Sequence, residues 1–421
     1  MGSTVIAMPE GDNQEVPVRE NKKSKFSRRI LCMVSFPVKN DKRRVRHSIK
    51  VGVALVLVSL LYLLDPLYEQ VGDNAMWAIM TVVVVFEFYA GATLSKGLNR
   101  GIGTILGGGL GCLAAVFAEE VGGVGHAIII GTSVFIFGTA ATYARLIPSI
   151  KKRYDYGAMI FILTFNLVAV SGIRADKVVQ LARERLSTIV IGFAICIFVS
   201  LLVFPIWSSD ELHDSVASRF SDLAASIQGF TEEYFAFTGD KESRPEFSFS
   251  SCKSVLHSKS KDELLANFAR WEPWHGKFGL FHPWDKYLTI AELLRDIATT
   301  IISLKPSLQS SRESSDQSRR ELIKEPCEGV GRSLAWILRE LGESLKKTRR
   351  CHSEILLLPK LETMREELSQ MMSSSRLGQF ENADGFAVAS FLFSFMEIID
   401  KVEELAKEVE QLGKLAHFAI K

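Results

Sequence analysis

LNRGIGTILGGGLGCLAAVFA, residues 98–118, is the stretch that decides the fold, because its 21 positions contain one charged side chain, Arg100. A helix of about 20 apolar residues is long enough to cross a hydrocarbon core about 30 Å thick. An ionised group at membrane depth is costly and usually faces a pore or a partner. The stretch therefore predicts a transmembrane helix with a candidate functional residue at its start.

Five more apolar runs lie on either side of this stretch. Each is predicted to be helical, because lipid offers no water to hydrogen-bond an open backbone. The alternative is a set of buried helices in a soluble protein, but six runs in succession with few charges argue against it. The predicted spans are 48–65, 75–95, 98–118, 125–144, 156–172 and 186–207.

The remainder of the 421 residues is polar and charged. A mean hydropathy of +0.15 together with 23% charged residues indicates one apolar part and one charged part. We predict an all-α membrane protein with six transmembrane helices and a cytosolic helical domain. The predicted domains are a basic arm (1–47), a transmembrane pore domain (48–207) and the cytosolic domain (208–421).

Several function classes lack their motifs. The six cysteines are scattered without a CxxC pair, which argues against a disulfide framework and a thiolate zinc site. The sequence has no Walker loop, HExxH or GxSxG, so ATP-driven transport and hydrolysis have no support. We expect no enzyme, no cofactor, no metal and no nucleic-acid partner.

The distribution of charge between the spans predicts the orientation. Basic residues lie in the second and fourth loops, and acidic residues lie in the first and third. Both termini are therefore expected in the cytosol. Residues 21–50 carry eleven Lys and Arg and one Asp, so this basic arm is expected to contact anionic membrane lipid. An unstructured arm that binds acidic partners is the alternative.

The fifth loop breaks this pattern, because it is expected on the far side of the membrane yet is basic. Its cations are Arg174, Lys177, Arg183 and Arg185. One explanation is that part of the loop is a helix that enters the membrane, with its cations facing an aqueous path.

Four ionisable side chains near or within the spans are candidate site residues. Lys96 lies one turn before Arg100, so both share a face if the helix continues. If Arg100 and Arg185 meet in one aqueous path, they select anions, since Arg binds carboxylates through its planar fork. The alternative is that both extend toward lipid head groups. Glu87 is either a structural ion-pair partner of Lys96 or an Arg, or a proton-coupling group, and Trp77 is expected to anchor a span at the interface.

The glycines of residues 98–118 form a further pattern. Small residues allow close helix contact in lipid. Their face is predicted to pack against another span or to let the backbone line a pore. The glycines are Gly101, Gly103, Gly107, Gly108, Gly109 and Gly111.

The polar half is predicted to be helical over 210–238, 252–270, 285–305, 319–348, 352–375 and 386–418. Apolar residues three or four apart in the last range form an amphipathic stripe that is typical of a core contact. They are Leu392, Met396, Ile399, Val402, Leu405, Val409 and Leu412. Residues 307–321 are Ser-rich and are predicted to be a flexible linker.

Residues 267–287 concentrate tryptophan, phenylalanine and proline. Proline disfavours helix at the preceding residue, so helices are expected to end here. His275 and His282 could be metal ligands, but no third ligand has suitable spacing. A packed corner between helices is the favoured interpretation.

Several long strings resemble the plant aluminium-activated malate transporter family. They are NAMWAIMTVVVVFEFYAGATLSKGLNRG (74–101), RYDYGAMIFILTFNLVAVSG (153–172), RLSTIVIGF (185–193), VFPIWSSDELH (203–213) and VLHSKSKDELLANFARWEPWHGKF (255–278). The last contains the WEP triplet, Trp271, Glu272 and Pro273. The resemblance extends from about Val45 to Lys286.

This resemblance implies an anion channel that passes malate and inorganic anions such as sulfate, nitrate and chloride. It implies a homodimer in the plasma membrane or the vacuolar membrane. It also implies that Arg100 and Arg185 line the pore and that Glu272 of the WEP triplet has a regulatory role. Two alternatives remain open: a proton-coupled carboxylate carrier that uses Glu87 or Asp155, and a membrane-anchored scaffold.

Overall fold

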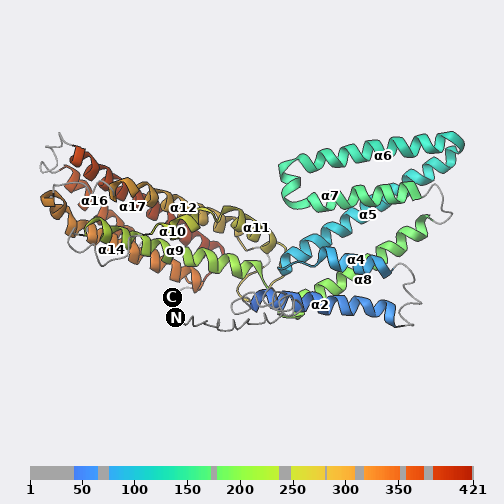
Figure 1. The fold of residues 1–421 in the computed structure, drawn as a ribbon, viewed down its shortest axis with the longest axis horizontal. Helices are drawn as coiled ribbons and strands as arrows, with labels where there is room; N and C mark the ends of the chain where they lie inside the picture. The colour runs from blue at the N-terminus through green and yellow to red at the C-terminus, as the bar shows by residue number, and fades with distance from the viewer. Residues whose placement is uncertain are drawn as a thin grey trace, which may run out of the picture. The chain divides into compact units, whose positions relative to one another are not determined.

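The computed structural model describes residues 42–64, 75–171, 178–236, 248–279, 282–308, 317–350, 357–373 and 383–419. Within these ranges every regular element is a helix, and the two isolated β-bridges, His275–Phe278 and Arg349–Ala419, form no strand. The prediction of an all-α protein is therefore confirmed for the part of the chain that the structure describes (Figure 1).

The chain forms two compact units, residues 1–49 and 50–421. In the first unit, residues 42–49 begin helix α2 (Lys42–Leu63), where Ser48 Oγ donates a hydrogen bond to the carbonyl of Arg44 at 3.0 Å. The expected lipid contact of the basic arm falls largely on residues 1–41, which lie outside the described ranges. The helices of the second unit carry the candidate site.

Six helices occupy the region of the predicted spans. Two of them, α5 (Ala90–Val121) and α6 (Gly123–Leu146), are long and apolar enough to cross a membrane. Shorter apolar helical stretches lie at Met76–Val85 and Leu186–Leu202. The number of spans therefore stays a prediction. The remaining helices of this region are α2, α4 (Ala75–Val85), α7 (Pro148–Ser171) and α8 (Val178–Leu202).

The predicted boundary between the second and third spans is wrong. We predicted one helix over 75–95, but α4 ends at Val85 and residues 86–89 are not helical. Backbone N–H groups at this break form hydrogen bonds outside a helix. The Glu87 N–H donates to Thr93 Oγ1 and the Ala90 N–H donates to the carbonyl of Ile206, each at 3.0 Å. Irregular backbone is tolerated in apolar surroundings when it is satisfied in this way. Lys96 and Arg100 consequently lie inside α5.

The glycine face of α5 packs against α7, as one of the two interpretations predicted. A Cβ placed on Gly107 would lie 2.6 Å from the carbonyl oxygen of Phe161, and one on Gly111 would lie 3.0 Å from Cβ of Val168. A Cβ on Gly109, in contrast, would meet nothing within 4 Å. Close approach of the two backbones therefore depends on particular glycines of the run.

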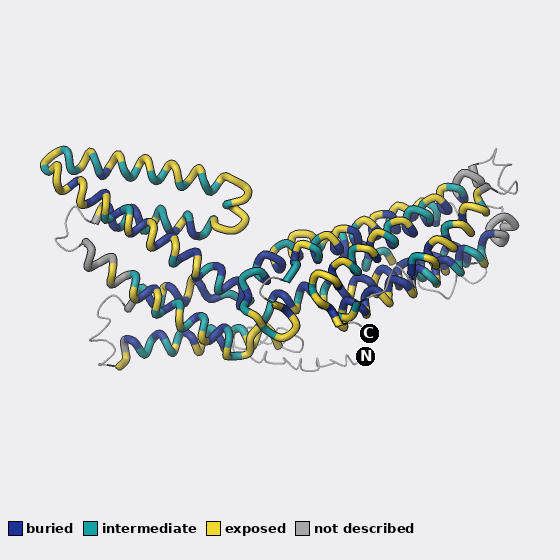
Figure 2. Tube along the Cα trace, turned by 180° about the vertical axis from the view of Figure 1, so that it is seen from behind, coloured by how far each residue is buried: buried dark blue, intermediate teal, exposed yellow. Residues whose placement is uncertain are grey.

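The other apolar helices differ in how far they are covered. Ala54 of α2, Val82 of α4 and Cys196 of α8 belong to one buried cluster. Helix α6 has a single buried residue, Ile130, and Figure 2 shows the remainder of α6 as partly or fully exposed. The apolar exposed surface of α6 is what a lipid-facing helix presents.

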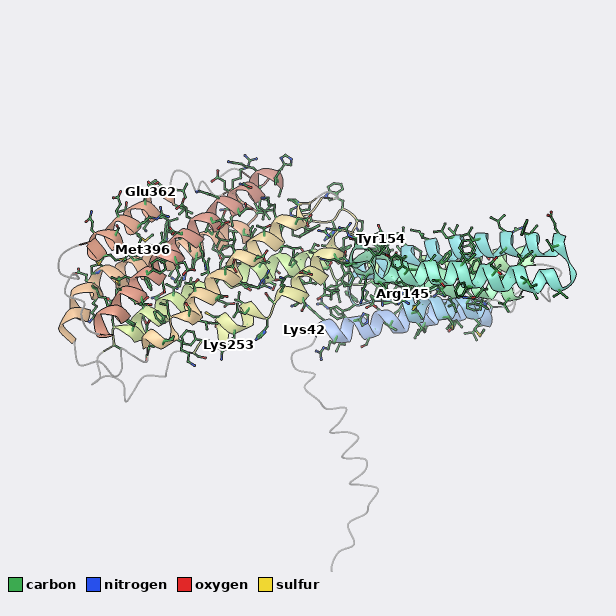
Figure 3. The ribbon with its side chains drawn as sticks, turned by 90° about the horizontal axis from the view of Figure 1, so that it is seen from above. Lys42, Arg145, Tyr154, Lys253, Glu362 and Met396 are labelled. Atoms are coloured by element: carbon green, nitrogen blue, oxygen red, sulfur yellow. The ribbon has the colours of Figure 1, made fainter. Side chains whose placement is uncertain are left out.

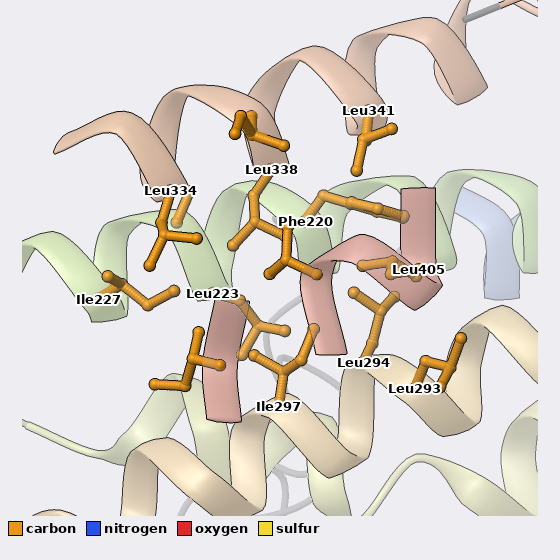
Figure 4. Packing of buried hydrophobic residues seen from close by; sticks show 14 of the residues in the cluster. Phe220, Leu223, Ile227, Leu293, Leu294, Ile297, Leu334, Leu338, Leu341 and Leu405 are labelled. Atoms are coloured by element: carbon orange, nitrogen blue, oxygen red, sulfur yellow. The ribbon is translucent and has the colours of Figure 1, made fainter. Parts of the chain in front are cut away.

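Seven helices form the described part of the polar half. Their core is a single buried cluster, in which Figure 4 shows residues of four helices converging: Phe220, Leu223, Ile227, Leu293, Leu294, Ile297, Leu334, Leu338, Leu341 and Leu405. The predicted stripe of the last helix is confirmed, because six of its members are buried and Met396 is partly buried against the cluster. The helices are α9 (Ser208–Tyr234), α10 (Ser250–Leu256), α11 (Lys259–Ala269), α12 (Trp284–Ser303), α14 (Gln317–Lys346), α16 (Leu358–Ser373) and α17 (Ala383–Leu415).

Two predictions in this half need correction. The single helix expected over 252–270 is divided into α10 and α11, because Ser258 Oγ donates to the carbonyl of Val255 at 2.7 Å and contacts Asp262 at 3.1 Å. The linker expected over 307–321 overlaps α14, which already begins at Gln317, while residues 309–316 lie outside the described ranges.

Helix α11 is fixed by a buried ion-pair cluster. The Arg219 guanidinium of α9 donates to both oxygens of Asp262 at 2.7 and 2.6 Å, and Arg295 of α12 donates to the same carboxylate at 3.2 Å. The three side chains are 7%, 1% and 11% exposed. Removing one partner from such a cluster leaves a buried charge unpaired. The cluster therefore sets the position of the WEP triplet, which follows α11 directly.

The glycine contacts predict different effects for two nearby substitutions. Gly107→Val forces a side chain against the α7 backbone, and overpacking of this kind typically costs ~1–3 kcal/mol. Gly109→Val makes the same chemical change in open space. We expect Gly107→Val to lower the thermal midpoint and the yield of monodisperse detergent-solubilised protein, with Gly109→Val close to wild type. Equal losses in the two variants would contradict the packing.

Candidate functional site

Arg100 lies on the side of α5 that faces α7, and it is buried. It is 6% exposed, and its Nη1 donates to the hydroxyl of Tyr156 at 3.2 Å. Its Nε has no hydrogen-bond partner, and no carboxylate pairs with it among the described residues. A guanidinium removed from water and bonded to a neutral hydroxyl keeps an uncompensated positive charge, which is electrostatically favourable for an anion.

Lys96 lies one turn before Arg100 on the same face, since α5 is continuous across both. Its ammonium forms an ion pair with Glu87 and lies 6.0 Å from the ring centroid of Tyr156. The Lys96 and Glu87 side chains are 37% and 35% exposed. The sequence prediction that Glu87 pairs with Lys96 or an Arg is therefore confirmed for Lys96.

Neutral polar groups surround Arg100. Asn99 Nδ2 donates to the carbonyl of Arg153 at 3.1 Å and thereby links α5 to α7. The hydroxyl of Thr104 is buried and has no partner among the described residues. The site thus combines two cations with hydroxyl groups that retain hydrogen-bonding capacity.

The structure does not bring the other predicted span residues into this cluster within the part of the chain that it describes. The Arg185 side chain lies outside the described residues, so its meeting with Arg100 stays a prediction. Arg183, on the same helix, is exposed. Trp77 is partly exposed on α4, where its carbonyl accepts a hydrogen bond from Thr81 Oγ1 at 2.7 Å, and nothing here tests its expected role as an anchor.

Arg145 and Asp155 form a separate ion pair between α6 and α7. Arg145 Nε and Nη2 donate to the two oxygens of Asp155 at 2.8 and 3.2 Å. Figure 3 labels Arg145 among the side chains. Both side chains are at least one-third exposed. Unlike Arg100, Arg145 has a compensating carboxylate. Asp155, an alternative proton site in the sequence analysis, is occupied by this pair.

Sequence reasoning missed a buried cation, Lys50. It is 0% exposed, its ammonium donates to the carbonyl of Ser200 at 3.3 Å, and it lies 5.9 Å from the ring centroid of Phe86. The Ser200 hydroxyl is buried and has no partner in the part of the chain that the structure describes. In the sequence Lys50 is the last member of the basic segment, so only its place at the start of an apolar run distinguishes it.

The WEP triplet caps the first turn of α9. Glu272 Oε1 accepts hydrogen bonds from the Ser208 N–H and hydroxyl, both at 2.6 Å, and Oε2 accepts from the Ser209 N–H at 3.2 Å. Trp207 occupies the N-cap position and supplies no capping bond of its own. A carboxylate at a helix N-terminus is stabilised by free N–H groups and by the helix dipole. Glu272, which is 6% exposed, therefore replaces the missing local cap.

His275 strengthens the same junction. Its ring stacks on Trp207 with centroids 3.8 Å apart. Its Nδ1 lies 2.8 Å from the carbonyl of Pro273, which can only accept, so Nδ1 donates. The other nitrogen, Nε2, then accepts from Ser209 Oγ at 3.0 Å. This full use of both nitrogens fits the structural interpretation of His275 over the metal interpretation.

The corner of residues 267–287 that contains the WEP triplet, here called the WEP corner, also contacts the start of α5. A Cβ on Gly91 would collide with the carbonyl oxygen of Phe268 and would lie 2.8 Å from Cγ of Glu272. The Tyr89 ring lies 6.4 Å from that of Phe268. The bond from Ala90 to Ile206 lies beside these contacts. The helix that carries Lys96 and Arg100 therefore begins against the residues that cap α9.

Buried rings continue the corner toward α12. His213 Nδ1 lies 2.8 Å from the hydroxyl of Tyr287, and burial lowers the pKa of His213. The His282 ring lies edge-on to Phe278 and tilted against Trp284, and burial together with the nearby His213 lowers its pKa to about 4. The described residues contain no group of three or more His, Cys, Asp and Glu side chains that could hold a metal.

An all-α chain whose apolar helices enclose cations is typical of a membrane transport protein. The family described as aluminium activated malate transporter matches residues 37–413. The chain therefore belongs to this family, and the resemblance drawn from the sequence is confirmed.

Comparison with individual relatives supports the same family. Aluminum-activated malate transporter 13 of Arabidopsis thaliana is 45% identical over 361 residues, which cover 84% of this chain and 67% of the relative. Transporter 14 of the same plant is 45% identical over 322 residues, covering 76% and 59%. Aluminum-activated malate transporter 1 of Triticum aestivum is 36% identical over 397 residues, covering 90% and 84%. The chain thus spans about three-fifths to two-thirds of the length of the first two.

The capping geometry predicts that the Glu272 charge stabilises the junction. Glu272→Gln removes the charge and places an amide N–H₂ where an oxygen accepted a backbone N–H. A buried N–H group that loses its acceptor in this way costs ~1–3 kcal/mol. We expect a thermal midpoint several degrees below wild type in detergent. Glu404→Gln, an exposed position on α17, is the matched control and should change little. Equal midpoints for the two variants would contradict the capping role.

The buried imidazole predicts a pH effect. A His whose pKa is lower in the folded state binds more protons when unfolded, so its stabilising contribution is present above pH ~6.5 and is lost as the pH falls toward ~4. His282→Phe removes this proton linkage and also an unpartnered Nε2. The thermal midpoint should therefore fall less between pH 7 and pH 5 in His282→Phe than in wild type. The exposed His257→Phe should retain the wild-type pH dependence.

Proposed function

We propose that this protein is an anion channel that passes malate and other anions, including sulfate, nitrate and chloride, down their electrochemical gradient. Arg100 and Lys96 bind the anion, and Arg185 contributes to the same pore. The names of the relatives support malate as a substrate. The buried, uncompensated charge of Arg100 carries the proposal.

The electrostatics of Arg100 favour the entry of an anion. Its guanidinium has an unpartnered Nε in surroundings where water is scarce, so an approaching anion gains a charge-assisted hydrogen bond. Among the described residues, Arg100 is hydrogen-bonded to a neutral hydroxyl and to no carboxylate, so none of them must be displaced from it. Conduction requires binding that is favourable enough to enter and weak enough to leave.

The membrane arrangement belongs to the same proposal. The helices α2, α4, α5, α6, α7 and α8 each cross the membrane, with both termini in the cytosol, and the chain assembles as a homodimer in the plasma membrane or the vacuolar membrane. The basic arm contacts anionic lipid. The exposed apolar surface of α6 supports a lipid or subunit contact for that helix.

The WEP triplet has a regulatory role in this proposal. Glu272 holds the first turn of α9, and the same corner contacts the start of α5. A displacement of the polar helices therefore reaches the helix that carries Arg100 through direct contacts. Two discrete arrangements of this junction would bias the pore between conducting states.

A proton-coupled carboxylate carrier is the second candidate, because Glu87 lies beside the cations of the site. Voltage clamp separates the two functions. A channel current reverses at the equilibrium potential of the anion, whereas a carrier current reverses at a potential that moves with the pH gradient. A scaffold without transport produces no anion current.

The channel proposal predicts a specific loss of current for Arg100. Loss of a charge-assisted hydrogen bond worth ~1.5–3 kcal/mol should reduce the current by about tenfold or more in Arg100→Gln. Arg145→Gln removes an arginine that is already paired, so its current per channel should stay near wild type. Currents in a heterologous cell are normalised to surface protein, with malate, sulfate, nitrate and chloride exchanged on each side. Normal current and selectivity in Arg100→Gln would refute the pore.

A further inference from the structure

Glu87 lies where an anion would reach Lys96. It belongs to the non-helical residues 86–89, and its backbone N–H is held by Thr93 Oγ1 at 3.0 Å. Its carboxylate pairs with the Lys96 ammonium. The backbone bond fixes the turn without the side chain, so the carboxylate can leave Lys96 without unwinding a helix.

The pair sets the charge of the site. Lys96 and Arg100 contribute two positive charges on one face of α5, and Glu87 contributes one negative charge, so the net charge is +1 while the pair is closed. Release of the carboxylate raises it to +2. A monovalent anion can bind Arg100 alone, whereas a dicarboxylate needs a cation for each end. Side chains at i and i+4 lie close enough for one small molecule to reach both.

Tyr156 connects the two cations. Its ring lies 6.0 Å from the Lys96 ammonium, and its hydroxyl accepts from Arg100 at 3.2 Å. An accepting hydroxyl keeps its own hydrogen available for donation. A carboxylate placed between the cations would thus meet an ammonium, a guanidinium and a hydroxyl donor.

We propose that Glu87 is a tethered carboxylate that occupies Lys96 when the site is empty, and that one carboxylate of a transported dicarboxylate displaces it. Glu87 thereby sets the preference of the site between dicarboxylates and monovalent inorganic anions. The inference rests on the proposed anion-channel function and names the specificity residue of that site.

The exposure of the pair favours displacement over a fixed structural role. Partly exposed ion pairs contribute little, ~0.2–1 kcal/mol, so an arriving carboxylate can compete with Glu87. The Arg219–Asp262 pair of the polar half is different, since its side chains are 7% and 1% exposed and both carboxylate oxygens are bound. Of these two pairs, the Glu87 pair is therefore the one that combines low strength with access to the site.

Voltage clamp of the full chain tests the inference. The malate concentration that gives half-maximal current and the malate-to-chloride permeability ratio are measured at neutral pH, where both malate carboxyl groups are ionised. Neither quantity depends on the number of channels. Glu87→Gln should lower the half-saturating concentration by about two- to fivefold and raise the ratio. Glu119→Gln, an exposed position near the other end of α5, is the matched control and should match wild type.

Lys96→Gln distinguishes competition from a structural ion pair. Competition predicts shifts in opposite directions, because Glu87→Gln frees the ammonium and Lys96→Gln removes it. It also predicts that the double variant behaves like Lys96→Gln. A structural pair predicts the same direction for both single variants, since each breaks the same contact. Shifts in one direction would overturn the inference.

The remaining outcomes are also decisive. Glu87→Asp keeps the charge but shortens the side chain. It should therefore shift the half-saturating malate concentration in the same direction as Glu87→Gln, but by less. Glu87→Asp replaces Glu87→Gln in the test if Glu87→Gln does not reach the membrane. A conducting wild type with an unchanged Glu87 variant overturns the tethered carboxylate alone. A wild type that conducts no anion overturns the proposed function and this inference together.

Discussion

The start of α5 at Ala90 is the constraint on which the rest of the structure depends. The Ala90 N–H donates to the carbonyl of Ile206, and the next residues, Trp207 and Ser208, begin the helix that Glu272 caps. Each residue of an α-helix turns the side-chain direction by about 100°. If the sequence were shifted by two residues along the same helical backbone, the side chains of Lys96 and Arg100 would point away from α7. One hydrogen-bonded junction therefore fixes both the cation face and the attachment of the polar helices.

The sequence predicted those parts of the fold that depend on residue spacing along a single helix. The stripe of α17 and the glycine contact of α5 follow from spacing along one helix. The break at 86–89 does not, because the run VVVVFEFYAG stays apolar across it and the partner of Ala90 lies at Ile206, far along the chain. The division between α10 and α11 similarly depends on a side chain, Ser258, that a periodic pattern passes over.

Some residues of the candidate site could likewise be found from the sequence and others could not. Arg100, Lys96 and Glu87 could be found from the sequence because a charge in an apolar run is conspicuous. Tyr156 could not be found, since an aromatic residue in an apolar run has the same pattern whether it faces lipid or a guanidinium. Lys50 was hidden by the basic residues before it, although it is the more deeply buried cation. Charge in the sequence therefore identifies candidate site residues more readily than the neutral groups beside them.

Two buried carboxylates of the polar half and two buried cations of the apolar half differ in how they are paired, and this difference supports transport. Asp262 and Glu272 in the polar half have both oxygens bound, so these carboxylates hold helices in place. Arg100 and Lys50 in the apolar half are buried with neutral partners, and the hydroxyls of Thr104 and Ser200 are buried without a partner within the ranges that the structure describes. Unsatisfied buried donors are costly, so a fold that needed only rigidity would gain by pairing them. Unpaired cations and hydroxyls are what a site requires when its counter-charge arrives with the ligand and leaves with it.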